Sequence, residues 1–262
     1  MAAIVIGTAV GNTARHNSEQ ENFAGARSGA GEAVGAEAAA TGLNGTPNSL
    51  SAMTVGLKVD NIKDSGPPLQ LLQKYSILRY FMVFPIPDLG GIRIDSASIK
   101  LTSAGYTVTT DGDNRYFQKK GKLVAGALAD ETTVAAGDYD SINVSSLTNY
   151  DDTSGITISA TADESVTTTL NSAALTKINT LTSGGNFVVC LMEYEHDHQN
   201  NGVGSYEAID AAYATSVGLD GFHIIENGES NEPVLSIFRS AGKVQFTGRN
   251  HFQHGKYTMK TI

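Results

Sequence analysis

The densest group of side chains able to bind a metal ion is the run from Glu193 to His198. If the preceding strand continues through this run, its acids lie on one face and its histidines on the other. Carboxylates suit a hard cation such as Ca²⁺, whereas histidines suit Zn²⁺. The candidate metal ligands are Glu193, Glu195, Asp197, His196 and His198. Side chains two residues apart stand about 7 Å from each other, so a solvated strand end is the competing interpretation.

Catalytic motifs give no second candidate. The chain contains no G-x-S-x-G elbow, P-loop, Rossmann glycine pattern or H-E-x-x-H pair. The single cysteine, Cys190, lies in the apolar run 187–192, which predicts a packed core thiol rather than a nucleophile. We therefore predict a protein that is not an enzyme and that holds no cofactor, with Ca²⁺ at residues 193–198 as the alternative.

Charge is unevenly distributed along the chain. The net charge is −9, yet residues 240–262 carry four basic side chains and no acid. Basic residues interleaved with aromatic ones suit single-stranded nucleic acid or a protein interface. The acidic body favours the protein interface, and we expect no nucleic-acid partner. The residues predicted to bind a partner are Arg15, Arg27, Lys243, Arg249, His251, Phe252, His254, Lys256 and Tyr257.

Composition divides the chain into three regions. Residues 1–48 include 20 Gly or Ala and lack a sustained apolar stripe, which is typical of a linker or an extended arm. Such an arm would lie on its own body, on a sister subunit or on a larger assembly. Residues 49–240 form the predicted body, and residues 241–262 form a basic C-terminal tail.

Short apolar runs predict that the body is all-β. Residues 53–59 alternate as a half-buried strand does, and residues 75–85 are rich in aromatic and aliphatic side chains. A short glycine-containing turn joins 75–85 to 92–102, so these two strands are expected to be neighbours in one sheet. Residues 187–192 are apolar on both faces and predict the deepest strand. Further strands are expected at 106–109, 122–128 and 233–238.

One helix is expected between the strands. Apolar residues at near-helical spacing place it at 170–181, with Asn171 or Ser172 as the N-cap. Gly184 and Gly185 are expected to end it. No segment reaches the roughly 20 apolar residues that span a bilayer, so no membrane partner is expected.

The stretch from 75 to 238 resembles the DNRLRE family, carbohydrate-binding-like jelly-roll modules of phage-associated and bacterial surface proteins. The matching segments are RYFMVFPIPDL, IDSASIKL, AGDYDSI at 136–142, ITISATADESVTTTLNSAALTKIN, SGGNF, VVCLM and NGESNEPVLSI at 227–237. The resemblance implies a jelly-roll β-sandwich with a short helical crossover. The chain has no tryptophan, although sugar-binding faces commonly use aromatic platforms.

These features predict a virion structural protein, namely a bacteriophage capsid decoration protein or another accessory subunit. It would be made in the host cytoplasm and would bind neighbouring subunits, including copies of itself, through its termini. One alternative is a carbohydrate-binding module on a fibre or cell surface. The stacking groups in that case would be Tyr106, Tyr116, Tyr139, Tyr150 or Tyr194. The other alternative is an extracellular filament whose subunits complete each other's sheets with the arm.

Overall fold

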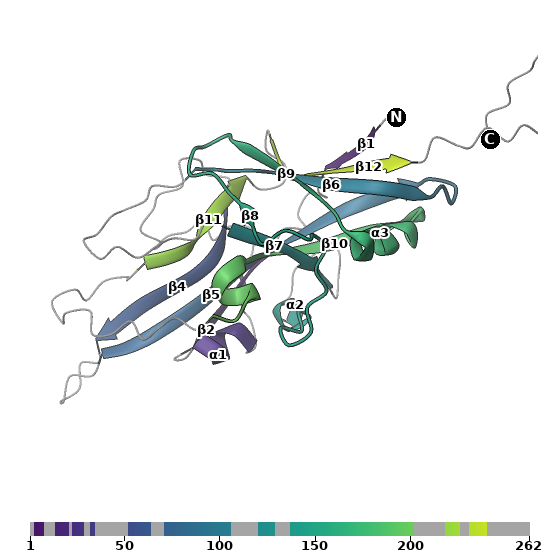
Figure 1. Cartoon of the computed structure of the whole chain (residues 1–262). Coiled ribbons are helices and arrows are strands. Elements are labelled where there is room, and N and C mark those ends of the chain that lie inside the picture. The colour runs from purple at the N-terminus through teal and green to yellow at the C-terminus, as the bar shows by residue number, and fades with distance from the viewer. Residues whose placement is uncertain are drawn as a thin grey trace, which may run out of the picture.

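Strands dominate the chain and form two antiparallel sheets (Figure 1). The computed structural model describes residues 3–7, 14–20, 23–28, 32–34, 52–63, 71–105, 120–128, 137–201, 218–225 and 231–239. The smaller sheet has the order β1-β12-β6-β9, with bounds Ala3–Gly7, Val234–Arg239, Ile94–Thr102 and Ser165–Thr169. The larger sheet has the order β11-β4-β5-β10-β7-β8, with bounds Gly218–Ile225, Ala52–Lys63, Leu71–Asp88, Ser183–Glu193, Lys120–Ala125 and Ile156–Thr157. β2 (Ala14–Gln20) and β3 (Glu32–Val34) extend it.

The predicted all-β sandwich is confirmed by the way the two sheets share a core. Tyr80, Met82 and Phe84 of β5 point between the sheets and pack in one cluster with Ile99 of β6 and Leu235 of β12. Because side chains alternate along a strand, the residues between them point to the other face of β5. Both faces of β5 are therefore buried between residues 77 and 84, as are both faces of β10 between residues 187 and 193.

A third layer covers the outer face of the larger sheet. It contains α1 (Phe23–Ser28), α2 (Gly137–Asp140) and a π-helical turn, η1 (Tyr194–His198). α1 and α2 lie below the larger sheet in Figure 1, on the side away from β6 and β12. Phe81, Val83 and Cys190 pack there with Ile142, and Ile77 packs with Ala26 and Tyr139. The predicted core position of Cys190 is confirmed.

β5 organises the larger sheet because three strands pair along it. β4 pairs with residues 71–78, β10 with residues 80–88 and β2 with residues 75–81. Residues 75–78 and 80–81 each have a partner on both edges. β2 therefore follows one edge of β5, while β4 and β10 follow each other along the opposite edge. The change from β4 to β10 falls at Arg79.

The expectation that 75–85 and 92–102 are neighbours in one sheet is wrong. β5 belongs to the larger sheet, and β6 pairs with β12 and β9 in the smaller one. The turn between them does not close a hairpin, because the N–H groups of Leu89 and Gly91 donate to the carbonyl of Thr182. Gly90 and Gly91 both have positive φ, at 63° and 73°, and redirect the chain to the other sheet.

The predicted helix is confirmed as α3 (Ser172–Asn179), and its start has the predicted cap. The Asn171 side chain accepts from the N–H groups of Ala173 and Ala174. The predicted stop is wrong, because the helix ends at Asn179 with Thr180 as its C-cap. Gly184 and Gly185 instead lie within β10, directly after its first residue Ser183, with φ of 99° and 146°.

The described parts of the predicted arm lie on the chain's own body. β1 pairs with β12 in the smaller sheet, β2 pairs with β5 in the larger sheet, and α1 joins the outer layer. The strand expected at 106–109 and the tail 241–262 fall outside the described residues. In the described part of the chain, no helix combines the length and apolar character needed to cross a bilayer.

Candidate functional site

A buried arginine interrupts an otherwise apolar and aromatic stripe on the outer face of β5. Arg79 follows Tyr75 and Ile77 on that face and precedes Phe81 and Val83. Its side chain is fully buried. A guanidinium removed from water in this way needs both a counter-charge and hydrogen-bond acceptors, because burying an uncompensated charge costs several kcal/mol.

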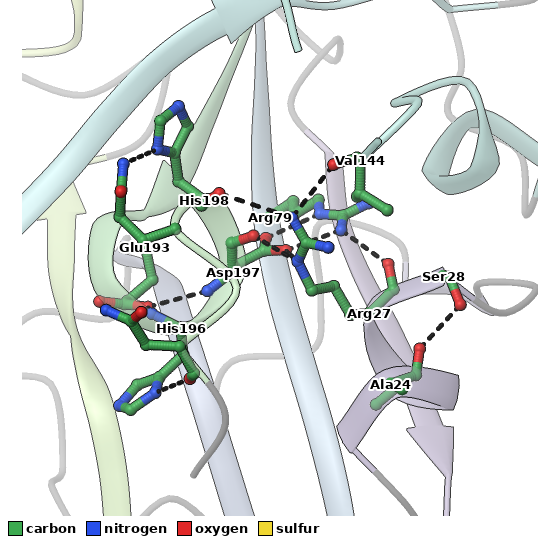
Figure 2. Close-up of polar contacts among 12 residues, drawn as sticks. Ala24, Arg27, Ser28, Arg79, Val144, Glu193, His196, Asp197 and His198 are labelled. Carbon is green, nitrogen blue, oxygen red and sulfur yellow. Dashed lines mark hydrogen bonds and ion pairs between the residues drawn. The ribbon is translucent and has the colours of Figure 1, made fainter. Parts of the chain in front are cut away.

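Asp197 supplies the counter-charge from η1, 118 residues further along the chain (Figure 2). Arg79 Nε donates to one carboxylate oxygen at 2.8 Å, and Arg79 Nη2 donates to the other at 2.8 Å. This is the two-pronged geometry that matches a guanidinium to a carboxylate. Burial alone would lower the pKa of Arg79, but the charge and hydrogen bonds of Asp197 raise it above its usual value. Arg79 is therefore permanently charged.

The remaining donors of Arg79 reach two more segments. Nη1 donates to the carbonyl of Tyr139 at 3.2 Å, and Nη2 donates to the carbonyl of Arg27 at 2.9 Å. The guanidinium also lies over the Tyr139 ring, 4.0 Å from its centroid. One side chain on β5 thus binds α1, α2 and η1 together.

Arg27 completes this cluster from the end of α1. Its Nε donates to the carbonyl of Asp197 at 2.6 Å and lies 3.8 Å from the Asp197 carboxylate. Its Nη2 donates to the carbonyl of Val144 at 3.2 Å (Figure 2). Arg27 is predicted from the sequence to bind a partner, yet its side chain is buried inside the protein. Its partners are segments of its own chain.

Glu193 positions Asp197 by capping η1. Its carboxylate accepts from the N–H groups of Glu195 at 2.7 Å, His196 at 2.6 Å and Asp197 at 3.1 Å. Burial raises the pKa of Glu193 to about 7, against the opposing effect of these hydrogen bonds. The strand does not continue through 193–198, so the alternation of acids and histidines that depended on it does not occur: the cap turns the chain into a helix.

The two histidines of η1 also bond within the chain. His196 Nδ1 lies 2.9 Å from the carbonyl of Asn201. His198 Nε2 lies 2.8 Å from Asn149 Oδ1, and Gln199 Nε2 lies 2.9 Å from His198 Nδ1. The side-chain oxygen of Asn149 accepts and the amide of Gln199 donates, so the proton of His198 is assigned to Nε2. Burial lowers the pKa of His198, which favours this neutral form.

The run 193–198 holds the candidate metal ligands of the sequence, given as the alternative to a solvated strand end, and the structure separates its members. The Glu193 carboxylate faces backbone N–H groups, and the Asp197 carboxylate faces Arg79. Across the described ranges, no three His, Cys, Asp or Glu side chains gather closely enough to hold a metal ion.

A second buried ion pair lies on β7. Lys122 Nζ donates to Asp151 Oδ1 at 2.9 Å and to the carbonyl of Thr153 at 2.6 Å. Asp151 Oδ2 accepts from the N–H of Leu123 at 2.9 Å, and Oδ1 accepts from the N–H of Thr153 at 2.9 Å. This pair fixes the turn at 149–153 against β7. It joins residues only 29 positions apart.

Sequence reasoning missed Arg79, although its signal was present. Side chains two residues apart share one face of a strand, so Arg79 lies on the same face as the apolar and aromatic residues Tyr75, Ile77, Phe81 and Val83. If that face is buried, the charge of Arg79 is removed from water. Of the predicted partner-binding residues, Arg15 lies in β2 with only its backbone described. Lys243, Arg249, His251, Phe252, His254, Lys256 and Tyr257 lie outside the described residues.

Comparison with known proteins identifies no relative of this chain. No protein-family model matches the chain, and no curated protein matches it either.

Proposed function

We propose that the chain is a structural subunit of a larger protein assembly, and specifically an accessory subunit of a bacteriophage particle. The observation that carries this proposal is that the ionisable side chains of the two buried clusters, around Arg79–Asp197 and Lys122–Asp151, bond to groups of their own chain. Arg79, Asp197 and Arg27 bond to one another and to carbonyls of their own chain. Lys122 and Asp151 do the same on β7.

Inward bonding suits a scaffold for a physical reason. A catalytic acid or nucleophile must reach a substrate and change its protonation or bonding state during the reaction. Asp197 is held by two prongs of one guanidinium, and Glu193 by three backbone N–H groups. These contacts cross-link the third layer to the sheet, which favours a rigid body that presents constant surfaces to its neighbours.

The phage setting rests on the resemblance of residues 75–238 to the DNRLRE family of jelly-roll modules. A sandwich without an internal disulfide is compatible with assembly in a cytoplasm, since the single cysteine is buried. The strand order of a jelly roll is part of the proposal, together with a location in the virion.

The experiment follows the chain through particle purification. Particles of a virus that carries the gene for this chain are banded on a density gradient and probed with an antibody against the purified protein. The expected result is co-migration with the particles at a constant ratio to the major coat protein, after a salt wash. Recovery of the chain only in the soluble fraction or on the host surface would contradict the proposal.

Truncation of the N-terminal region is a poor test, because that region contributes to folding. Deleting residues 2–45 would remove β1, β2, α1 and β3. It would also remove the Arg27 carbonyl that accepts from Arg79 and the side chain that bonds to η1. Loss of assembly after such a deletion would not separate a missing interface from an unfolded body.

The carbohydrate-binding alternative has lost two of its five candidate stacking groups. Tyr139 packs beneath Arg79, and Tyr150 stacks on Phe187 in the core at a centroid distance of 5.2 Å. Both are buried. Tyr194 is partly exposed and stacks on His198, whereas Tyr106 and Tyr116 lie outside the described residues. Glycan-array binding that Tyr194→Ala abolishes would favour this alternative over the structural subunit.

A further inference from the structure

β1 forms one edge of the smaller sheet, at the N-terminal end of the chain. It pairs with β12 from Ala3 opposite Phe238 to Gly7 opposite Val234. Among the strands that the structure describes, β12 is its one partner. The N–H and C=O groups on the other edge of β1 therefore point away from the described sheet, in the orientation that accepts a further strand.

The side chains of β1 lack the usual protection of an edge. The strand reads Ala-Ile-Val-Ile-Gly, with no charge and no proline. Ile6 is buried in the main core and Ile4 packs against it, whereas Val5 faces outward and is 65% exposed. Natural edge strands commonly carry lysine, proline or a bulge that prevents pairing between molecules. β1 has none of these features.

The opposite edge of the same sheet differs in chemistry. β9 reads Ser-Val-Thr-Thr-Thr, and its exposed positions Ser165, Thr167 and Thr169 all carry hydroxyl groups. Hydroxyl groups bond readily to water, whereas an exposed valine gains free energy when it is covered. The sheet therefore has one polar edge and one apolar edge, and the apolar edge is the one that favours protein contact.

We propose that β1 pairs with β1 of a second copy of this chain, antiparallel and centred on Val5. This inference rests on the proposed function as an assembly subunit and names the surface through which two copies meet. Of the symmetric registers, only the one centred on Val5 pairs all five residues, with Ala3 opposite Gly7 and Ile4 opposite Ile6. Antiparallel self-pairing is two-fold symmetric, so the same surface serves both copies.

This register keeps like side chains on one face. Ile4 and Ile6 of one copy lie beside Ile6 and Ile4 of the other on the inner face, and Val5 meets Val5 on the outer face. The two four-stranded sheets become one continuous sheet. Five residues bury less than the roughly 1,000 Å² that a stable interface requires, so the pairing is weak alone and gains strength at the high local concentration of an assembly.

A cysteine cross-link tests the pairing and its register in the full chain. Directly opposed residues of an antiparallel pair have Cα atoms about 4.5–5.5 Å apart, which is within the range of a disulfide. Val5→Cys is expected to form a disulfide-linked dimer under mild oxidation. The native thiol does not interfere, because Cys190 is fully buried. The matched control is Ile92→Cys, at an exposed apolar residue of the β5–β6 turn that is 40% accessible.

The expected result is a Val5→Cys dimer that forms at least about tenfold faster than the Ile92→Cys dimer. A mixture of Ala3→Cys and Gly7→Cys chains should cross-link faster than either variant alone, because these positions face each other. Val5→Lys should abolish concentration-dependent self-association in sedimentation, since it places like charges directly opposite. Equal rates for Val5→Cys and Ile92→Cys would overturn the pairing.

The outcome is distinguishable from failure of the proposed function. A chain that co-migrates with virus particles but gives no Val5→Cys dimer would retain its structural role and lose this interface. A chain that forms the dimer but is missing from particles would retain the interface and lose the role in the virion.

Discussion

Arg79–Asp197 and Lys122–Asp151 are both buried ion pairs on the larger sheet, yet they join parts of the chain at different separations. Lys122 and Asp151 are 29 residues apart, and Asp151 keeps three donors from Leu123 and Thr153 in addition to the lysine. Arg79 and Asp197 are 118 residues apart, and Arg79 also holds carbonyls of α1 and α2. The first pair completes a local turn, whereas the second assembles a layer.

The difference shows how a buried charge can organise a sheet that has two covered faces. Without Arg79, apolar contacts would hold α1, α2 and η1 against β5 but would not fix their positions, because hydrophobic burial has no direction. The planar guanidinium of Arg79 specifies direction and distance for all three segments at once. His198 connects the two regions, since its Nε2 bonds to Asn149 beside the Lys122 turn.

Replacement of Arg79 by alanine is expected to have the largest effect on stability. It leaves the Asp197 carboxylate buried without its main partner and removes the donors to Tyr139 and Arg27. Loss of one member of a buried pair lowers the free energy of unfolding by about 3–5 kcal/mol, which urea unfolding at pH 7 measures. A loss below about 1 kcal/mol would contradict the view that Arg79 organises the layer.

The matched control is Arg93→Ala. Arg93 pairs with Asp95 at 3.6 Å on the surface and is 84% exposed, so its removal should leave the free energy nearly unchanged. Cys190 gives a second readout of Arg79→Ala, because in the wild type burial raises the pKa of its thiol and keeps the thiol unreactive. A thiol reagent should modify Cys190 faster in Arg79→Ala than in the wild type under native conditions.

Glu193→Gln is expected to change the pH dependence of stability. Burial raises the pKa of Glu193 from 4.5 to about 7, so the folded protein binds this proton more tightly than the unfolded chain. The contribution to stability is complete below pH 4.5 and is lost as the pH rises to about 7. Relative to Glu193→Gln, the wild type should lose about 2–3 kcal/mol over this interval. Parallel pH profiles of the two proteins would contradict this prediction.

Lys122→Met is expected to lower the free energy of unfolding by about 2 kcal/mol, less than Arg79→Ala. Asp151 keeps its bonds to Leu123 and Thr153, so its charge stays partly satisfied. Chemical unfolding of both variants under identical conditions measures the difference. If Lys122→Met were the more destabilising variant, the local pair would be the dominant one and the comparison would be reversed.

Asn171→Ala is expected to have the smallest effect, a loss of about 1 kcal/mol from removal of the α3 cap. The Asn171 side chain also donates to the carbonyl of Asn149, in the turn that the Lys122–Asp151 pair holds against β7. Thr176→Ala is the matched control on the same helix, because its hydroxyl bonds only to the carbonyl of Ser172 on an exposed face. That control should be neutral or slightly stabilising, since alanine is the better helix former.

Local patterns in the sequence predicted the elements better than their partners. The alternation of 53–59, the apolar run 187–192 and the cap at Asn171 each describe what neighbouring residues do, and the structure confirms them as β4, β10 and α3. The pairing of 75–85 with 92–102 was wrong. Its outcome depended on Thr182, which accepts the N–H groups of the turn from a distant part of the chain.

The candidate site shows the same division. The sequence pattern picks out two residues of the cluster singly, Asp197 as a candidate metal ligand and Arg27 as a candidate partner-binding residue. Their contact joins positions 170 residues apart, and no local pattern encodes it. The cap by Glu193 is local, but it becomes visible only once η1 replaces the strand that alternation predicts.

The sequence by itself determined an all-β chain with a capped helix and a buried cysteine, because periodicity and capping depend on near neighbours. The tertiary structure alone decided that β1 and β2 of the Gly/Ala-rich region enter the sheets. It alone decided that Arg79, Asp197 and Arg27 meet. These outcomes depend on which distant segments exclude water together, and a buried charge takes the partner that the fold brings within hydrogen-bond reach.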